Sequence, residues 1–147
     1  MKLTYSVHEL VHGSPEYQDL VALRRAILRL PLGLDFTDEQ LAAEATDIHL
    51  GAYHGHGQLV GGLILTPLSP STLKMRQVAV AESAQHAGVG TALVRRSEEL
   101  ARGLGYHTLV LNARDTAVPF YLKLGYALVG ELFVEVGIPH RSMQKHL

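Results

Sequence analysis

Residues 75–95, MRQVAVAESAQHAGVGTALVR, are the part of this chain that most constrains its fold. An apolar, β-prone run at 75–80 leads through a short polar connection to a glycine turn, and a helical pattern follows from about Thr91. Glycines let another molecule approach the backbone, because no Cβ stands in the way. The first N–H groups of a helix lack intrahelical partners and carry the positive end of the helix dipole. The stretch therefore predicts a strand, a turn and a helix N-terminus suited to an anion such as a diphosphate.

Two common phosphate-binding motifs do not match this turn. The dinucleotide fingerprint G-x-G-x-x-G needs a third glycine, and Gly88 and Gly90 are followed by Thr91-Ala92-Leu93. The P-loop needs a lysine after its last glycine, and none follows Gly90. What remains, Q-x-x-G-x-G at residues 85–90, resembles the coenzyme A pyrophosphate loop of the GNAT (Gcn5-related N-acetyltransferase) superfamily. For the glycines alone, an ordinary strand-to-helix turn is an equally good interpretation.

A second segment strengthens the resemblance. Residues 112–126, NARDTAVPFYLKLGY, are similar to the GNAT segment in which an asparagine ends a strand and A-x-x-F-Y-x-K-x-G-[FY] follows on a helix. The resemblance covers residues 73–126 firmly, and segments 23–33 and 133–140 resemble a small-molecule acetyltransferase subgroup. His86 and Ala87 depart from the family pattern, because many relatives carry a basic residue and a glycine there. Phosphate binding would then depend more on backbone amides.

The family resemblance implies an α/β (α+β) fold, with a mixed, mostly antiparallel central sheet flanked by helices in a single domain over residues 1–147. Local patterns agree with it. Strands are expected at residues 3–7, 48–53, 59–65, 75–80, 106–112, 127–136 and 141–145. Helices are expected at residues 16–30, 37–43, 91–102 and 115–124. A right-handed crossover would make strand 106–112 parallel to strand 75–80.

Several details of these elements follow from single residues. Ser14 is expected to cap the first helix with Pro15 in its first turn, and Thr37 to open the second through a capping box. Asp115 is expected to cap the last helix. Glu98 and Arg102 are expected to form a solvent-facing i,i+4 pair. Turns are expected at residues 67–71 and 137–140.

Composition limits the classes of partner. The chain has 147 residues and a formal net charge of −1, so neither nucleic acid nor an anionic membrane is an expected partner. It has no cysteine, which excludes disulfides and thiolate metal sites. His54 and His56 have H-x-H spacing without a third ligand nearby, so no metal is expected. No hydrophobic leader region is visible and no apolar run approaches the ~20 residues that span a bilayer, so we expect a cytoplasmic protein.

The resemblance implies an acetyl-CoA-dependent N-acetyltransferase that acts on a primary amine of a small molecule such as an amino acid, a polyamine or an amino sugar. Tyr121 matches the position of the general acid that protonates the leaving thiolate; a core aromatic is the alternative interpretation. The positions implied to contact the coenzyme are Val78, Ala79, Val80, Gln85, His86, Ala87, Gly88, Val89, Gly90, Thr91, Asn112 and Phe120.

The acceptor side is less defined by the sequence. His140, Glu135 and His49 are candidates for the general base, because an alkylamine with a pKa near 10.4 must lose a proton before it reacts. Arg24 and Arg29 are expected to bind the acceptor; a solvated helix face is the alternative. A non-catalytic acyl-CoA sensor with the same cleft, a longer acyl donor and assembly into a homodimer remain open.

Overall fold

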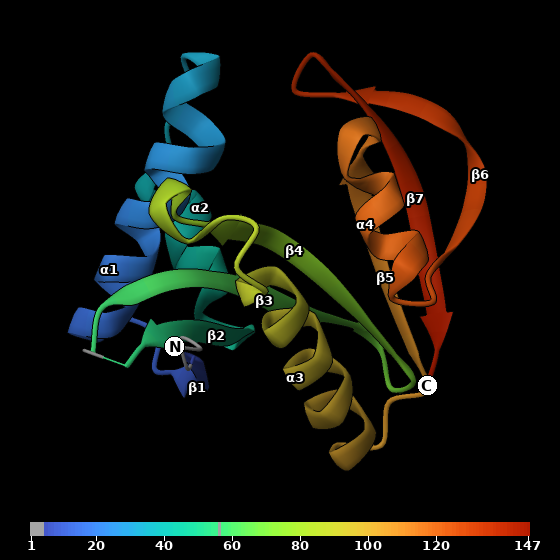
Figure 1. Cartoon of the computed structure of the whole chain (residues 1–147), viewed down its shortest axis with the longest axis horizontal. Coiled ribbons are helices and arrows are strands. Elements are labelled where there is room, and N and C mark those ends of the chain that lie inside the picture. Colours follow the sequence, from blue (N-terminus) through green and yellow to red (C-terminus); the bar gives the residue numbers. More distant parts are fainter. Residues whose placement is uncertain (1–4, 56) are drawn as a thin grey trace. The chain divides into compact units, whose positions relative to one another are not determined.

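The structure is a computed structural model that describes residues 5–55 and 57–147 (Figure 1). The chain forms two compact units. Unit 1 comprises Met1–Thr66 and Gln77–Ser97, and unit 2 comprises Pro67–Arg76 and Glu98–Leu147. The single domain expected over residues 1–147 stays a prediction. Within the described residues, no helix is both long and apolar enough to cross a membrane.

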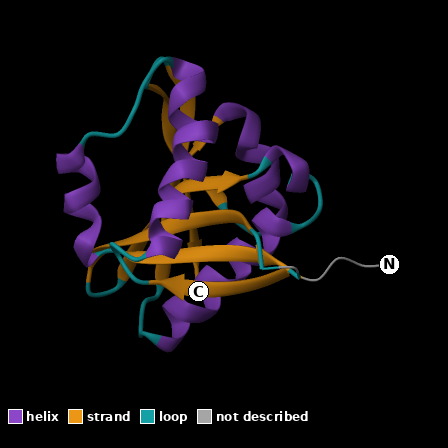
Figure 2. Ribbon diagram, turned by 90° about the vertical axis from the view of Figure 1, so that its left-hand side faces the viewer, coloured by secondary structure: helices purple, strands orange, loops and turns teal. Residues whose placement is uncertain are grey.

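The strands, drawn in orange in Figure 2, join in one mixed sheet, and the helices, drawn in purple, connect some of them. Unit 1 contains β1 (Tyr5–Leu10), α1 (Pro15–Arg24), α2 (Asp38–Ala42), β2 (Ile48–His54), most of β3 (Leu59–Ser69), the end of β4 (Thr72–Val80) and the start of α3 (Val89–Gly103). Unit 2 contains the remaining parts of β3, β4 and α3, together with β5 (Thr108–Arg114), α4 (Val118–Lys123), β6 (Ala127–Glu135) and β7 (Ile138–His146).

The strand order is β1-β2-β3-β4-β5-β7-β6. β1–β2, β2–β3, β5–β7 and β6–β7 are antiparallel. β4 and β5 are parallel, with partners from Thr72↔Thr108 to Met75↔Leu111. The predicted fold class, a mostly antiparallel mixed sheet with helices, is confirmed.

The first helical segment starts as predicted and ends earlier. Ser14 accepts a hydrogen bond from the Tyr17 N–H and Pro15 lies in the first turn. The expected helix 16–30 stops being α-helical after Arg24, where a π-helical turn (η1, Arg25–Arg29) and a 3-10 turn (η2, Leu30–Leu32) follow. Pro31 cannot donate a backbone hydrogen bond, which explains why regular helix does not continue through it. The predicted capping box at Thr37 is present.

Two consecutive glycines in β3 fix how the helices of unit 1 pack. A Cβ on Gly61 would lie 2.9 Å from the Val89 Cγ1 atom at the start of α3. A Cβ on Gly62 would lie 2.7 Å from the Leu50 carbonyl oxygen and would also clash with Leu20 of α1. Successive residues of a strand face opposite sides, so α1 and α3 cover opposite faces of β3. This contact cannot be predicted from the sequence, because glycines in a strand have no periodic pattern.

Several predicted boundaries are wrong. β3 continues to Ser69 and β4 starts at Thr72, so the expected turn at 67–71 is much shorter. β7 starts at Ile138, so His140 lies in a strand and not in a turn. Ala117, not Asp115, is the N-cap residue of α4, and Pro119 falls in its first turn, where no N–H is needed. Leu3 of the expected first strand lies outside the described residues.

Glu98 is also placed differently from the prediction. It is 3% exposed, and its carboxylate accepts hydrogen bonds from the Tyr126 hydroxyl at 3.0 Å and the Lys145 Nζ at 3.1 Å. Lys145 donates a further hydrogen bond to the Leu124 carbonyl. The predicted solvent-facing pair with Arg102 is therefore wrong. A carboxylate this deeply buried needs such partners, because an unpaired charge is very costly away from water.

Candidate functional site

The end of β4 in unit 1 leads into the glycine turn. Gln77 has a φ of 56°, which is unusual for a non-glycine residue inside a strand and marks an irregularity just before Val78, Ala79 and Val80. Gln85 then donates a side-chain hydrogen bond to the Val80 carbonyl at 3.1 Å. This bond ties the turn to the end of the strand. The sequence prediction did not include the irregularity at Gln77.

The turn itself is open on its outer side. His86 and Gly88 have φ values of 63° and 87°, and the side chains of Gln85, His86 and Ala87 are exposed. Within residues 5–55 and 57–147, a Cβ on Gly88 would meet no atom within 4 Å. The Ala92 N–H donates to the Gly88 carbonyl at 3.0 Å, which is the first hydrogen bond of the helix. The N–H groups of residues 89–91 precede it and therefore have no acceptor within the helix. Space beside the backbone and N–H groups at a helix start fit a diphosphate.

Tyr121 lies on α4 in unit 2. Its side chain is 6% exposed and its ring contacts the rings of Phe120 and Tyr126, with centroid distances of 4.9 and 5.8 Å. Burial raises the pKa of Tyr121 to about 12. The phenol is therefore fully protonated near neutral pH.

This pKa limits how Tyr121 could act as an acid. A thiol has a pKa of about 8.5, so proton transfer from a phenol with a pKa of about 12 is uphill by roughly 5 kcal/mol when the thiolate is fully hydrated. Burial raises the pKa of a thiol as it does that of a phenol, because both lose solvation of the anion. Tyr121 is hence suited to protonate a thiolate that is held away from water.

The structure brings together two of the three base candidates. The His140 Nδ1–H donates to the Ile138 carbonyl at 2.7 Å, which leaves Nε2 as the acceptor nitrogen. The Nε2 atom lies 3.7 Å from the Glu135 carboxylate, and the imidazole stacks on Phe133. His140 is 6% exposed. In this arrangement Nε2 can take up a proton and Glu135 can stabilise the resulting cation.

Asn112 and His140 share one face of the β5–β7 ladder. Asn112 is opposite Ser142, and its Oδ1 accepts a hydrogen bond from the Ser142 hydroxyl at 2.9 Å. His140 is two residues from Ser142, so both point to the same side. Lys145 points to the other side, with the cluster of Glu98, Tyr126 and Tyr121. The acid candidate and the base candidate thus belong to opposite faces of these two strands.

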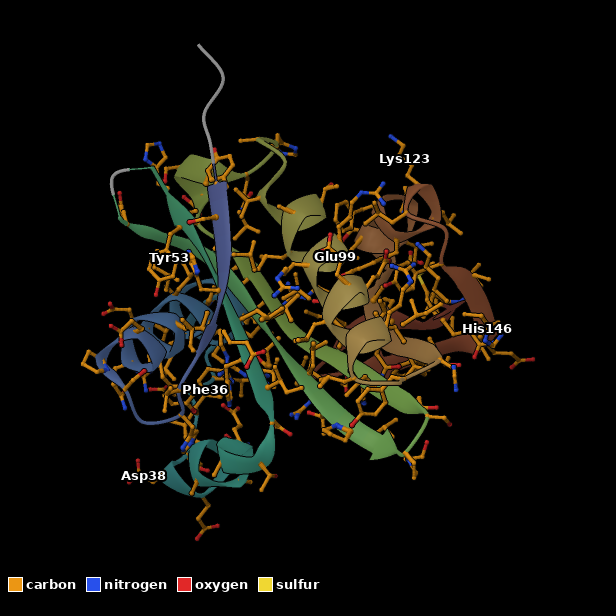
Figure 3. The ribbon with its side chains drawn as sticks, turned by 90° about the horizontal axis from the view of Figure 1, so that it is seen from below. Phe36, Asp38, Tyr53, Glu99, Lys123 and His146 are labelled. Carbon is orange, nitrogen blue, oxygen red and sulfur yellow. The ribbon has the colours of Figure 1, made fainter. Side chains whose placement is uncertain are left out.

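Arg24 is not part of a solvated helix face. It is fully buried in unit 1, and its two terminal nitrogens donate to the two Glu44 carboxylate oxygens at 2.9 and 2.6 Å. The Tyr17 hydroxyl donates to the same carboxylate at 2.8 Å. The guanidinium groups of Arg24 and Arg29 lie 4.7 and 4.9 Å from the centre of the Phe36 ring, which Figure 3 labels. Arg24 therefore links Glu44 and Phe36 in the interior of unit 1.

His49 belongs to the same buried group. Its Nε2 is 2.9 Å from the Glu44 carbonyl oxygen, and its ring lies edge-on to Tyr17. Burial lowers the pKa of His49. His49 is thus a core residue of unit 1. Of the H-x-H pair, His56 lies outside the described residues, and the described residues contain no group of three or more potential ligands that could hold a metal.

Comparison with known proteins decides the family. Residues 35–147 match the family model for an acetyltransferase (GNAT) domain. This chain belongs to the GNAT acetyltransferase family. The superfamily and the enzyme class predicted from the sequence, an acyl-CoA N-acetyltransferase, are thereby confirmed at the level of the family.

Individual relatives agree with this assignment. The chain is 40% identical to the uncharacterized N-acetyltransferase YjcF of Bacillus subtilis over 73 residues, which are 49% of this chain and about half (52%) of that protein. The structure of Escherichia coli ElaA has a TM-score of 0.81 at 21% identity and covers 97% of this chain and 99% of its own. A GNAT family acetyltransferase from Elizabethkingia anophelis with acetyl-CoA bound has a TM-score of 0.75 at 20% identity, with coverages of 97% and 98%. At these identities the two structures show the fold alone.

Proposed function

We propose that this protein transfers the acetyl group of acetyl-CoA to a primary amine of a small molecule. The observation that carries the proposal is Tyr121, which is 6% exposed and whose pKa burial raises to about 12. Its phenol therefore carries a proton near neutral pH and can serve as a general acid. Family membership and the acetyl-CoA bound to the Elizabethkingia anophelis relative support the same donor.

The turn at residues 85–91 would bind the diphosphate of the coenzyme. The N–H groups at the start of α3 would donate to its oxygens. The turn itself contains no lysine or arginine that could pair with the phosphates. The backbone of Val78, Ala79 and Val80 would pair with the pantetheine arm as an added strand does. Asn112 and Phe120 remain predicted coenzyme contacts.

In the reaction the amine nitrogen attacks the acetyl carbonyl carbon, a C–N bond forms and the C–S bond breaks. Because His140 and Tyr121 lie on opposite faces of β5 and β7, the amine would approach on the His140 face and the sulfur would leave on the Tyr121 face. His140 Nε2 would take the proton that the amine loses, assisted by the Glu135 carboxylate at 3.7 Å. Tyr121 would give its proton to the departing sulfur. Solvent then restores one proton to Tyr121 and removes one from His140, so the enzyme returns to its starting state.

For the acceptor, Arg29 is the remaining candidate for direct contact. Arg24 would not contact the acceptor, because its guanidinium is already bound to Glu44. It would instead position Phe36, whose ring also contacts Arg29. A cation at Arg29 would suit an amine that also carries a negative group. Amino acids fit this description better than polyamines do.

An acceptor panel tests the proposal. The protein is mixed with acetyl-CoA and single amines (amino acids, polyamines and amino sugars), and free thiol release is followed together with the mass of the product. We expect acceptor-dependent thiol release and a product heavier by one acetyl group for at least one amine. Tight acetyl-CoA binding without transfer to any acceptor would contradict the proposal and favour an acyl-CoA sensor.

A further inference from the structure

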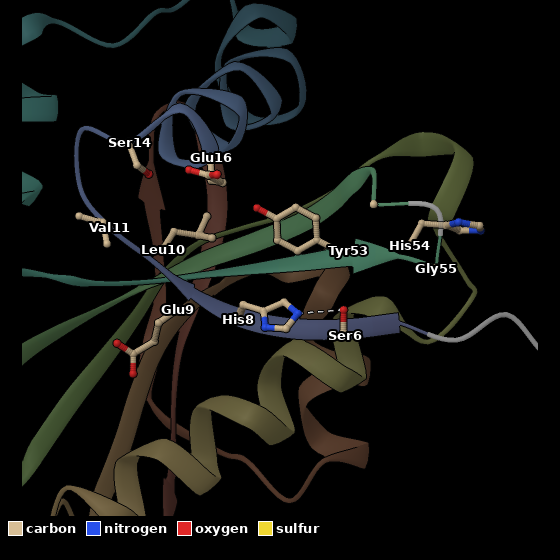
Figure 4. Close-up of a pocket in the computed structure, with 11 residues that line it drawn as sticks. Ser6, His8, Glu9, Leu10, Val11, Ser14, Glu16, Tyr53, His54 and Gly55 are labelled. Atoms are coloured by element: carbon tan, nitrogen blue, oxygen red, sulfur yellow. Dashed lines mark hydrogen bonds between the residues drawn. The ribbon is translucent and has the colours of Figure 1, made fainter.

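A hollow on unit 1 is separate from the residues assigned above. β1, the first turn of α1 and the end of β2 line a cavity of about 640 Å³ (Figure 4). This volume lies in the range of small-molecule pockets, roughly 300–1,000 Å³. The three elements all belong to unit 1, so the hollow is complete within it.

The hollow is on the α1 face of the sheet. Ser6 and Tyr53 are directly opposite each other in the β1–β2 ladder and share this face. Figure 4 shows Glu16 of α1 and the N-cap residue Ser14 on the same side as the Tyr53 ring, whereas Glu9 points to the opposite side. Because α1 and α3 cover opposite faces of β3, the hollow does not share a face with the helix that follows the coenzyme turn.

Aromatic rings and negative charge meet in this hollow. The rings of His8 and Tyr53 are tilted toward each other with centroids 5.8 Å apart. Burial raises the pKa of Tyr53, and the negative charges of Glu16 and Asp19 raise it further. The described lining residues include no lysine or arginine. A cation would therefore gain from both the ring face and the carboxylates.

The start of α1 does not make this an anion site. Pro15 has no N–H, and the Tyr17 N–H already donates to the Ser14 hydroxyl at 3.1 Å. The Glu16 carboxylate occupies the first turn and repels a second negative charge. Leu10 and the 75% exposed Val11 add an apolar wall. An ammonium group on an apolar stem matches this combination of carboxylate, ring and aliphatic surface.

We propose that this hollow binds an organic ammonium ion, with the cation between Glu16 and the Tyr53 ring and its stem along Leu10 and Val11. This is a second ligand site, in addition to the acceptor site of the proposed acetyl transfer. It does not require an N–H on the ligand, since ring and carboxylate attract charge. The test can therefore use a cation that no acetyltransferase could acetylate.

Butyltrimethylammonium is such a probe, and n-butanol and inorganic phosphate are its neutral and anionic counterparts. Binding to the full chain is measured by titration calorimetry, and backbone amide shifts of His8 and Tyr53 are followed by NMR to locate it. We expect saturable binding of the cation alone. Glu16→Gln and Tyr53→Leu should each weaken it by about tenfold, and Tyr53→Phe should retain it.

Glu9→Gln is the matched control, because it removes the same charge from the rim residue that points away from Tyr53. It should leave binding within about twofold. Equal losses in Glu9→Gln and Glu16→Gln would show unspecific attraction and overturn the proposal. Equal binding of n-butanol, binding of phosphate instead of the cation, or no amide shifts at His8 and Tyr53 would overturn it as well.

Discussion

Replacing Glu44 by glutamine should strongly destabilise the protein. Glu44 holds both terminal nitrogens of the fully buried Arg24 and the hydroxyl of Tyr17. The amide keeps the size of the carboxylate and loses its charge. Arg24 is then a buried cation without a counter-ion, and its Nε already has no hydrogen-bond partner among the described residues.

Breaking a buried ion pair on one side costs about 3–5 kcal/mol. Glutamine can still accept a hydrogen bond, so we expect the lower end, about 3 kcal/mol. For a chain of this length that corresponds to a fall in Tm of roughly 6–12 °C. Arg24→Met combined with Glu44→Leu removes both charges and should recover a large part of the loss.

Thermal unfolding followed by circular dichroism measures the effect. Asp35→Asn is the matched control: it makes the same carboxylate-to-amide change in the exposed ion pair with Arg25, and should shift Tm by no more than about 2 °C. Equal shifts for Glu44→Gln and Asp35→Asn would refute the reasoning. So would a double variant no more stable than Glu44→Gln.

The same pair predicts how stability depends on pH. Burial alone would raise the pKa of Glu44, but the hydrogen bonds and charge of Arg24 outweigh it and hold this pKa below its usual value. The contribution of Glu44 is hence complete above about pH 4.3 and is lost as the pH falls through the lower folded pKa. The difference in Tm between wild type and Glu44→Gln should be constant near neutral pH and shrink in acid. His49, whose pKa burial lowers, should also make both proteins less stable as the pH falls below about 6.5.

Three further substitutions test the packing and the two halves of the candidate site. Gly62→Ala should destabilise by about 1–3 kcal/mol in a denaturant titration, because its Cβ would lie 2.7 Å from the Leu50 carbonyl, whereas Gly103→Ala has open space and should not destabilise. Gly88→Val should weaken acetyl-CoA binding in calorimetry by about tenfold or more, and Gly13→Val, which is strained at a similar φ of 82° with equally open space, should leave affinity unchanged. His140→Gln should lower kcat by about 10²-fold with an acceptor from the panel, while the exposed His146→Gln should not; a fully active His140→Gln would exclude it as the base.

Local signals in the sequence predicted much of the fold. The caps at Ser14 and Thr37 and the parallel pairing of β4 with β5 were predicted correctly, because each depends on neighbouring residues or on a handedness rule. Where distant packing decides, local patterns misled. Glu98 was predicted to face solvent and is buried against Lys145. For Arg24, the alternative of a solvated helix face is excluded by its buried ion pair with Glu44.

The candidate site divides in the same way. The turn at residues 85–91 was evident, since its glycines and the following helix are contiguous. The contact between Glu135 and His140 depends on the β6–β7 register. This register could not be predicted, because the turn was expected at residues 137–140. The strained Gln77 had no signal, because its φ of 56° departs from strand geometry at a residue type that does not favour positive φ. The hollow at Tyr53 joins segments more than 35 residues apart and was equally hidden.

The most direct test of the central claim compares acceptor-dependent thiol release by wild type and Tyr121→Phe. Phenylalanine keeps the ring contacts with Phe120 and Tyr126, so the fold should persist. If Tyr121 protonates the leaving sulfur, kcat should fall by about 10²-fold or more, while the KM for acetyl-CoA stays nearly unchanged. A folded Tyr121→Phe variant that turns over at the wild-type rate would contradict the account.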